Sequence, residues 1–184
     1  MPSSAAVIVA VAHGSESLET VTLVNLLRRA EIPVLLASIE DRLLIDGTRG
    51  LRVEADAAFE ADAAFAAPLL VLPGGEAGAR ALGQHRPLVQ VLQARREAAR
   101  PIAAICAAPA LVLAANGLLD GVRATGYPTF RDRLPAWIDE PVVRDGVFTT
   151  SQGPGTAIAF ALDLVEQLAG RPCRDRVAAG LLVA

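Results

Sequence analysis

Apolar residues along the chain fall into short continuous runs, separated by longer segments in which they recur at helical spacing. The continuous runs predict buried strands over residues 5–12, 33–39, 68–72 and 101–105. The periodic segments predict helices over residues 16–30, 76–83, 87–99 and 107–116. Strands that alternate with helices are typical of a mostly parallel sheet covered on both faces. The pattern therefore predicts an α/β protein.

Turn residues bound a further set of weaker elements. These are a small hairpin from 43–45 and 51–53, short strands near 123–125 and 142–150, a long helix from about 151 to 170, and a final helix or tail from 172. The sequence has 184 residues and contains no internal repeat or linker. Residues 1–184 are therefore expected to form a single domain.

The composition excludes several classes of protein. Apolar residues make up 53% of the chain and charged residues 20%, which does not fit a disordered protein. The formal charge is −3, and no basic stripe is interleaved with aromatic residues, so specific nucleic-acid binding is not expected. All 17 basic residues are arginine. The absence of lysine excludes a Schiff-base lysine and a phosphate-loop lysine.

Cellular location and metal content are also constrained. The longest apolar run, Ile102–Ala115, is too short to cross a bilayer, and Met1–Ser4 lack the basic region of a signal peptide. The two histidines and two cysteines lie too far apart for a zinc motif, and two cysteines make no disulfide framework. We therefore expect a cytoplasmic protein without a metal site and without membrane contact.

Cys106 is the strongest candidate for chemistry. It follows a buried strand directly and precedes a predicted helix, so the chain must turn sharply at this residue, where Ala104, Ala107 and Ala108 relieve crowding. A thiol there points toward the exposed end of the sheet, and the helix N-terminus is expected to lower its pKa. The alternative is an inert cysteine that belongs to the core.

Two acidic residues begin the first predicted helix, close to the loop that leaves the first strand. The carboxyl group of Glu19 is placed to approach a thiol at a neighbouring strand end, where it would donate a hydrogen bond or shuttle a proton. Glu16 lies three residues earlier on the same face. The alternative is that both residues only complement the helix dipole.

Glycine-rich loops offer candidate backbone donors. Gly74 and Gly75 follow a buried strand and allow N–H groups to turn toward a ligand oxygen, although a plain strand-to-helix turn has the same sequence. The segment 153–155 (Gly-Pro-Gly) is compatible with anion binding or with an ordinary helix start.

The remaining histidines and cysteine receive no catalytic role. His13 ends the first strand and is interpreted as a solvated loop residue, and His85 is expected at the surface. Cys173 lies in the C-terminal region and is expected to be a free thiol.

Five segments in sequence order resemble the ThiJ/PfpI superfamily, and within it the branch of the parkinsonism-associated deglycase and bacterial YajL. They are GSESLET at 14–20, PGGE at 73–76, AAICAAP at 103–109, ATGYP at 124–128 and TSQGPGT at 150–156. The resemblance runs from about residue 5 to residue 170. It implies a flavodoxin-like three-layer sandwich with a cysteine nucleophile elbow, assembled as a homodimer.

The resemblance also implies roles for individual residues. Cys106 matches the elbow nucleophile, and Glu19 matches a buried acid that hydrogen-bonds the sulfur. The backbone amides of Gly75 and Ala107 match the pair that faces the substrate oxygen, with Gly74 beside them. Glu16 matches a position near the pocket and the dimer interface. No cofactor is expected.

Other positions match the family's dimer interface or depart from its pattern. Arg49 matches a position near both pocket and interface, and Arg28 and Arg29 match positions close to that interface. Some relatives have a histidine near the thiol where this chain has Tyr127, and the protease-like branch has a histidine where this chain has Ala107. A Cys–His pair is therefore not expected, which argues against peptidase chemistry. Tyr127 is interpreted either as a hydrogen-bonding partner of the substrate or as a ring packed over the pocket.

The resemblance supports two functional hypotheses that need the same activated thiol. The first is a deglycase or glutathione-independent glyoxalase, whose partners are methylglyoxal, glyoxal or their early adducts on proteins and nucleotides. The second is a non-enzymatic sensor of oxidative stress or a redox-regulated chaperone that works through oxidation of Cys106.

Overall fold

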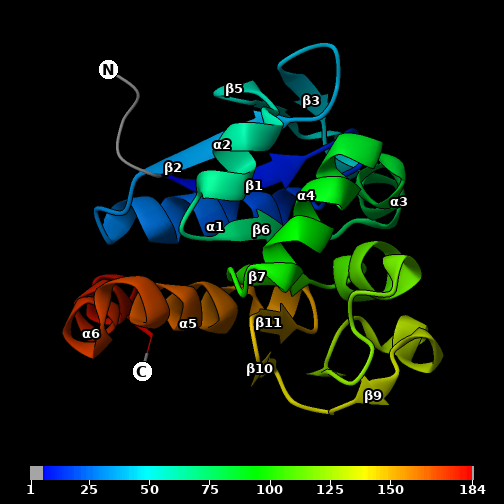
Figure 1. Ribbon diagram of the computed structural model, residues 1–184. Coiled ribbons are helices and arrows are strands. Elements are labelled where there is room, and N and C mark those ends of the chain that lie inside the picture. The colour runs from blue at the N-terminus through cyan, green and yellow to red at the C-terminus, as the bar shows by residue number, and fades with distance from the viewer. Residues whose placement is uncertain (1–5, 184) are drawn as a thin grey trace.

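The computed structural model describes residues 6–183 and confirms the α/β prediction (Figure 1). A seven-stranded sheet has the strand order β10-β11-β7-β6-β1-β2-β5, and every neighbouring pair except β10–β11 is parallel. Its strands are β1 (Val7–Val11), β2 (Val34–Ser38), β5 (Ala57–Ala58), β6 (Leu70–Leu72), β7 (Ile102–Ile105), β10 (Val142–Asp145) and β11 (Phe148–Ser151). The predicted strand start at Ala5 and the segment Met1–Ser4 lie outside the described residues.

Helices cover both faces of the sheet. They are α1 (Ser17–Arg29), α2 (Ala61–Ala66), α3 (Glu76–Gln84), α4 (Arg86–Glu97), α5 (Ala157–Ala169) and α6 (Arg171–Gly180). Helices α1, α5 and α6 pack in one layer, whereas α2, α3 and α4 form the other (Figure 1). Side chains such as Leu23 and Phe160 in the first layer, and Leu88 and Leu92 in the second, are fully buried. The result is the flavodoxin-like three-layer sandwich.

The direction of the crossovers explains these two layers. From β1 the chain moves through α1 to β2 on one side, and later returns to β6 on the other side of β1. Because parallel crossovers are right-handed, steps in opposite directions along the sheet place their helices on opposite faces. The loops after β1 and β6 therefore lead to opposite faces, and the carboxyl ends of these two strands are the place where open α/β sheets usually bind a ligand.

Two predicted elements are corrected by the structure. Residues 107–116 do not form one regular α-helix: Pro109–Leu113 follow a π-helical pattern and Ala114–Asn116 a 3₁₀ turn. Pro109 has no N–H to donate at the start of the segment, and Gly117, at φ 69°, ends it. Few residues are therefore left to form the regular hydrogen bonds of an α-helix. The stretch 142–150 is an antiparallel hairpin, because the chain reverses at Gly146 between β10 and β11.

Several short elements flank the main sheet. The predicted hairpin is present as β3 (Leu44–Asp46) and β4 (Arg52–Glu54), and β8 (Arg123–Ala124) pairs with β9 (Ala136–Trp137). Strand β5, helix α2, strand β9 and a 3₁₀ segment over Pro128–Arg133 were not predicted. No helix in the described part of the chain is both long and apolar enough to cross a membrane.

Arg95 on α4 holds two parts of this scaffold together from the inside. Its side chain is fully buried, and its guanidinium donates to the carbonyl oxygens of Ala64, Phe65 and Ala67 at 2.8, 3.0 and 2.9 Å. A fourth bond, of 2.6 Å, reaches the carbonyl oxygen of Pro101 before β7. These carbonyls lie at the end of α2 and the start of a central strand, so one side chain satisfies acceptors from both.

We expect Arg95→Met to lower the free energy of unfolding by about 3 kcal/mol, because it leaves several buried carbonyl groups without a donor. Urea unfolding monitored by circular dichroism measures the change. Arg80→Met is the matched control, since Arg80 on α3 is half-exposed and bonds only Glu76 on its own helix. Its effect should stay within about 0.5 kcal/mol. Equal effects of the two substitutions would contradict the structural role of Arg95.

Candidate active site

The candidate active site lies where the carboxyl ends of three neighbouring strands meet. Strand β6 lies between β1 and β7, and all three run parallel. The loop after β1 leads into α1 and Glu19, the loop after β6 contains Gly74 and Gly75, and β7 ends directly at Cys106. These are the strands at which the strand order reverses, which is the usual place for a ligand in an open α/β sheet.

Cys106 occupies a strained turn between β7 and the helical segment that follows. Its φ is +64°, a left-handed conformation that side-chain-bearing residues seldom adopt. Two backbone bonds hold it there: its N–H donates to Ser151 at 2.9 Å, and its carbonyl oxygen accepts from Tyr127 at 2.7 Å. The residue is 8% exposed. Strain of this kind is typical of functional sites, where the surrounding structure enforces it.

Glu19 is a fully buried acid beside this thiol. Its Oε2 accepts a 2.7 Å hydrogen bond from the N–H of Gly74, and its Oε1 has no hydrogen-bond partner among the described residues. Burial raises the pKa of Glu19 to about 7, while the bonds from Gly74 and Cys106 lower it, and the charge of Glu16 raises it slightly. The carboxyl therefore still binds a proton near neutral pH.

The absence of side chains at two glycines makes this closeness possible. A Cβ at Gly74 would lie 2.5 Å from Cys106 Cβ, 2.8 Å from Glu19 Oε2 and 2.9 Å from Cys106 Sγ. Gly75 has φ +80°, and a Cβ there would meet the backbone around Ser15. Any larger residue at position 74 would separate the acid from the thiol. The turn also directs the N–H groups of Gly75 and Ala107 toward the sulfur.

The expectation that the helix N-terminus lowers the thiol pKa is wrong for this structure. Burial raises the pKa of Cys106 to about 12, and the charge of Glu19 adds to the increase. The N–H groups of Gly75 and Ala107 act in the predicted direction but are outweighed. The physical reason is that the sulfur is largely removed from water and an acid lies next to it.

With pKa values of about 7 and about 12, the acid and the thiol begin to lose their first proton near neutral pH and keep the second one up to high pH. Ionisation of both groups would place two negative charges side by side in a buried site, so loss of the second proton is strongly opposed. The single negative charge can reside on the carboxylate or on the sulfur, and a proton transfer between neighbours interconverts the two forms. The arrangement is thus suited to produce a thiolate next to an acid that can return the proton.

The structure also places the other predicted site residues. Glu16 caps the start of α1, with Oε1 accepting from the N–H of Leu18 at 3.3 Å, and its charge acts on Glu19. The ring of Tyr127 lies close to Gly153, which in turn lies close to Cys106 Sγ. Gly153 was not singled out as a partner of the thiol. The TSQGPGT segment that contains it was the available signal.

The remaining candidate residues lie in other environments. His13 contacts the hairpin, where its Nδ1 accepts from the N–H of Asp46 at 3.0 Å. His85 caps α4 by accepting from Leu88 at 3.3 Å, and Cys173 is a half-buried free thiol. Within residues 6–183, no cluster of acidic, histidine or cysteine side chains is arranged to hold a metal ion.

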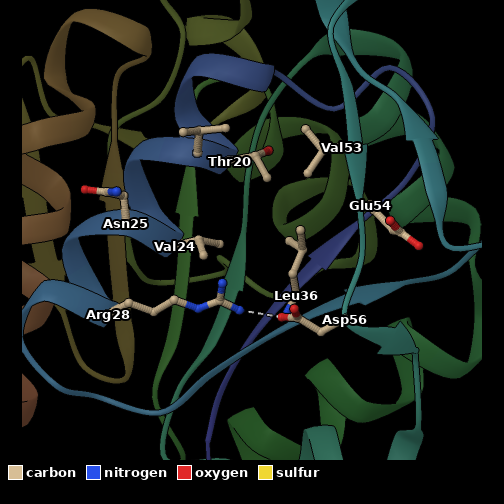
Figure 2. A pocket seen from close by; sticks show the side chains of 9 residues that line it. Thr20, Val24, Asn25, Arg28, Leu36, Val53, Glu54 and Asp56 are labelled. Atoms are coloured by element: carbon tan, nitrogen blue, oxygen red, sulfur yellow. Dashed lines mark hydrogen bonds and ion pairs between the residues drawn. The ribbon is translucent and has the colours of Figure 1, made fainter.

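Two grooves lie on α1, on the side that faces the β3–β4 hairpin. One has a volume of about 230 Å³ and contains the 2.6 Å ion pair between Arg28 and Asp56 (Figure 2). The other, of about 400 Å³, is lined by Glu16 and Arg49 and by exposed apolar side chains of Leu18, Val21 and Leu51. Glu16 and Arg49 thus line the same groove.

Comparisons with known proteins agree on one family. The model of the DJ-1/PfpI family matches residues 5–167. Protein DJ-1 homolog A of Arabidopsis thaliana is 39% identical over 183 residues, which are 96% of this chain and 46% of that protein, so the chain spans about half the length of this relative. Deglycase PYRAB04690 of Pyrococcus abyssi is 34% identical over 139 residues, covering 73% of this chain and 82% of that protein.

The solved structures give the same result. The structure described as "Toxoplasma gondii DJ-1, oxidized" superposes with a TM-score of 0.92 at 37% identity, and the match covers 98% of this chain and 100% of that chain.

The strain at Cys106 makes a prediction about stability. Cys106→Gly should be more stable than Cys106→Ala by about 1 kcal/mol, because only glycine adopts a φ of +64° without steric cost. Position 108, two residues later, is the control: with φ −66°, Ala108→Gly should instead destabilise the protein. Chemical unfolding of the three variants measures the differences. An Ala variant at position 106 as stable as the Gly variant would show that the turn is not strained.

Burial of Glu19 predicts a pH-dependent stability. Its folded pKa of about 7 exceeds the ordinary value of 4.5, so the folded state binds the extra proton between these values and stability falls as pH rises through that window. Glu19→Gln removes this titration. As the pH rises from 4.5 to 7, its free energy of unfolding should increase by about 3 kcal/mol relative to that of the wild type. Between pH 7 and pH 8 this difference should not increase further.

Urea unfolding of both proteins at pH 5 and at pH 8 tests this result. Asp62→Asn at the exposed start of α2 is a control for loss of an acidic group, and its effect should be nearly the same at both pH values. A constant difference between the wild type and Glu19→Gln across this range would mean that Glu19 has an ordinary pKa.

Proposed function

This chain belongs to the DJ-1/PfpI family, and from that membership we propose that it is a cofactor-independent, cysteine-dependent glyoxalase or deglycase. Its substrates are methylglyoxal, glyoxal or their early adducts on proteins and nucleotides. A relative at 34% identity carries the name deglycase, which supports this class of reaction. The observation that carries the proposal is the pairing of a thiol at a strained turn with a buried acid and two backbone N–H donors.

The reactive form is the one in which the sulfur carries the negative charge and Glu19 carries the proton. Ionised Glu19 raises the pKa of Cys106, because its negative charge lies next to the sulfur. Protonated Glu19 instead donates a hydrogen bond to the sulfur. In that form the sulfur faces the N–H groups of Gly75 and Ala107 as well as the acid. A carboxylate at Glu19 has one backbone donor, the N–H of Gly74. These additional donors reduce the cost of moving the charge to the sulfur, while the pKa values keep it mainly on the carboxylate in the resting protein.

Attack on the aldehyde begins the proposed reaction. The thiolate forms a C–S bond with the aldehyde carbon of methylglyoxal, and the carbonyl oxygen becomes an oxyanion facing the N–H groups of Gly75 and Ala107. Each such donor typically lowers the barrier by about 3 kcal/mol. The oxyanion then takes the proton from Glu19, which yields a hemithioacetal and a carboxylate.

Water completes the reaction and restores the thiol. The Glu19 carboxylate removes the hydrogen of the former aldehyde carbon as a proton, and the neighbouring carbonyl carbon regains a proton through an enediol, which gives a lactyl thioester. Hydrolysis of the thioester releases lactate and returns a proton to the thiol. The sum is methylglyoxal plus water to lactate plus a proton, so no external oxidant or reductant is needed.

Peptidase chemistry is not part of the proposal. A cysteine peptidase uses a histidine to protonate the leaving amine, whereas the residue after this cysteine is Ala107 and the aromatic residue nearby is Tyr127. His13 is engaged by the hairpin instead. Glu19 is the acid that contacts the thiol. One carboxyl suffices for the proton transfers that an aldehyde requires.

A homodimer remains part of the proposal. Leu18, Val21 and Leu51 are about half exposed along the α1 grooves, and burial of such side chains favours association. The resemblance places Arg28 close to the same interface.

A second candidate function is a sensor of oxidation. A structural relative is described as oxidized, and the N–H groups that face Cys106 Sγ would also stabilise a sulfinate anion. Hydrogen peroxide would supply the oxygen atoms in that case.

The proposed activity predicts that Cys106→Ser abolishes lactate formation. The hydroxyl is a far weaker nucleophile than the thiolate, so the rate should fall to that of a protein-free solution. Lactate is quantified enzymatically after incubation with methylglyoxal in a buffer without added thiols or amines, which form adducts themselves. Cys173→Ser, which removes the free thiol near the C-terminus, should retain wild-type turnover.

Two outcomes would contradict the enzyme. Lactate formation by Cys106→Ser at the wild-type rate would exclude the nucleophile. Absence of lactate from the wild type, together with a mass gain of two oxygens confined to Cys106 after mild peroxide treatment, would favour the sensor.

A further inference from the structure

The space around the thiol sulfur is bounded by two glycines that differ in what surrounds them. On one side, a Cβ at Gly74 would lie 2.9 Å from Cys106 Sγ and 2.8 Å from Glu19 Oε2, so this side is filled by the acid. On the other side, a Cβ at Gly153 would lie 3.9 Å from the sulfur, an ordinary van der Waals contact. The sulfur is thus less crowded on the Gly153 side than on the Gly74 side.

An aromatic ring closes this second side. The same Cβ at Gly153 would lie 3.2 Å from Tyr127 Cδ2 and 3.7 Å from Tyr127 Cε2. Tyr127 is 42% exposed, so its ring forms the border between the sulfur and solvent. A bulky electrophile that approaches the sulfur from this side therefore meets the ring of Tyr127 and the backbone of Gly153.

Hydrogen bonds hold the backbone of Tyr127 and of Gly153 in place. The N–H of Tyr127 donates to the carbonyl oxygen of Cys106 at 2.7 Å, so the ring is tied to the turn that carries the nucleophile. The N–H of Gly153 donates to Thr156 Oγ1 at 3.0 Å, and that hydroxyl lies 2.7 Å from Ser151 Oγ at the end of β11. The backbone of both residues is therefore fixed to the turn at Cys106 and to the end of β11.

We propose that Tyr127 and Gly153 form a size filter that restricts the thiol to electrophiles without a bulky group close to the reacting atom. The inference rests on the proposed function, whose substrate class it narrows: glyoxal and methylglyoxal fit, whereas an aromatic 2-oxoaldehyde such as phenylglyoxal meets the ring. The phenol hydroxyl takes no part, because the contact is made by ring carbons. Tyr127 therefore determines specificity rather than catalysis.

The filter is tested by a reaction that needs an accessible thiol but no turnover. In a Cys173→Ser background, Cys106 is treated with methyl methanethiosulfonate or with benzyl methanethiosulfonate, and intact mass follows each rate. The thiolate attacks the reagent's sulfenyl sulfur, forms a mixed disulfide and releases methanesulfinate. The parent protein should strongly prefer the methyl reagent. Tyr127→Ala should reduce that preference by about tenfold, and Tyr127→Phe should restore it.

Two glycine substitutions give a matched pair. Gly153→Ala is compatible with the extended backbone at that position, and its methyl group would touch the sulfur, so the methyl reagent should react about tenfold more slowly. At Gly155, two residues later, a Cβ would meet nothing within 4 Å, so Gly155→Ala should react like the parent. An unchanged preference in Tyr127→Ala, or parental rates in Gly153→Ala, would overturn the filter.

Turnover separates this inference from the proposed function. The ratio of kcat/KM for methylglyoxal to that for phenylglyoxal should fall in Tyr127→Ala by about the same factor as the reagent preference. If the wild type forms no lactate while the two reagents still discriminate as expected, the glyoxalase proposal fails and the filter stands. If lactate forms but the reagents do not discriminate, the filter fails and the glyoxalase proposal stands.

Discussion

A carboxyl group and a thiol are buried side by side, and the rest of the site is arranged around the single proton they share. Burial disfavours a charge on either group, and two adjacent charges would be costlier still. The pair is possible only because Gly74 has no side chain between them and because backbone N–H groups face both acceptors. The strained backbone at Cys106 contributes to the same pairing, because its left-handed φ turns the sulfur toward the acid.

The sequence predicts most of the scaffold because its main elements are continuous apolar runs or periodic helices. It fails where an element has too little length to carry a pattern. Strands β5 and β9 have two residues each and form only through pairing with β2 and β8. The stretch 142–150 contains enough strand-forming residues for one strand, but Gly146 reverses the chain within it. The irregular segment after Cys106 begins at a proline, which periodicity alone does not register.

The site is predictable to a different degree at each residue. A cysteine directly after a buried run identifies Cys106, because the strand and the following turn are local features. The contact with Glu19 depends on the order of β1, β6 and β7 in the sheet, which local pattern does not contain. The resemblance to a family supplied that partner. The pKa of the thiol was predicted in the wrong direction because desolvation depends on how closely surrounding segments pack. The position of Gly153 beside the thiol was not predicted for the same reason.

The electrostatics of the pair also constrain what the thiol can react with. The pair carries at most one negative charge at neutral pH, and Glu16 adds another acidic group nearby. An anionic substrate would bring a further like charge into a poorly solvated site, which is unfavourable. A neutral carbonyl compound brings none, and it becomes an oxyanion only where the N–H groups of Gly75 and Ala107 can accept it. Tyr127 stands where some relatives have a histidine, so this side offers no imidazole as a counter-charge. The charge of the pair and the proposed size filter therefore favour the same class of compound: small, uncharged electrophiles.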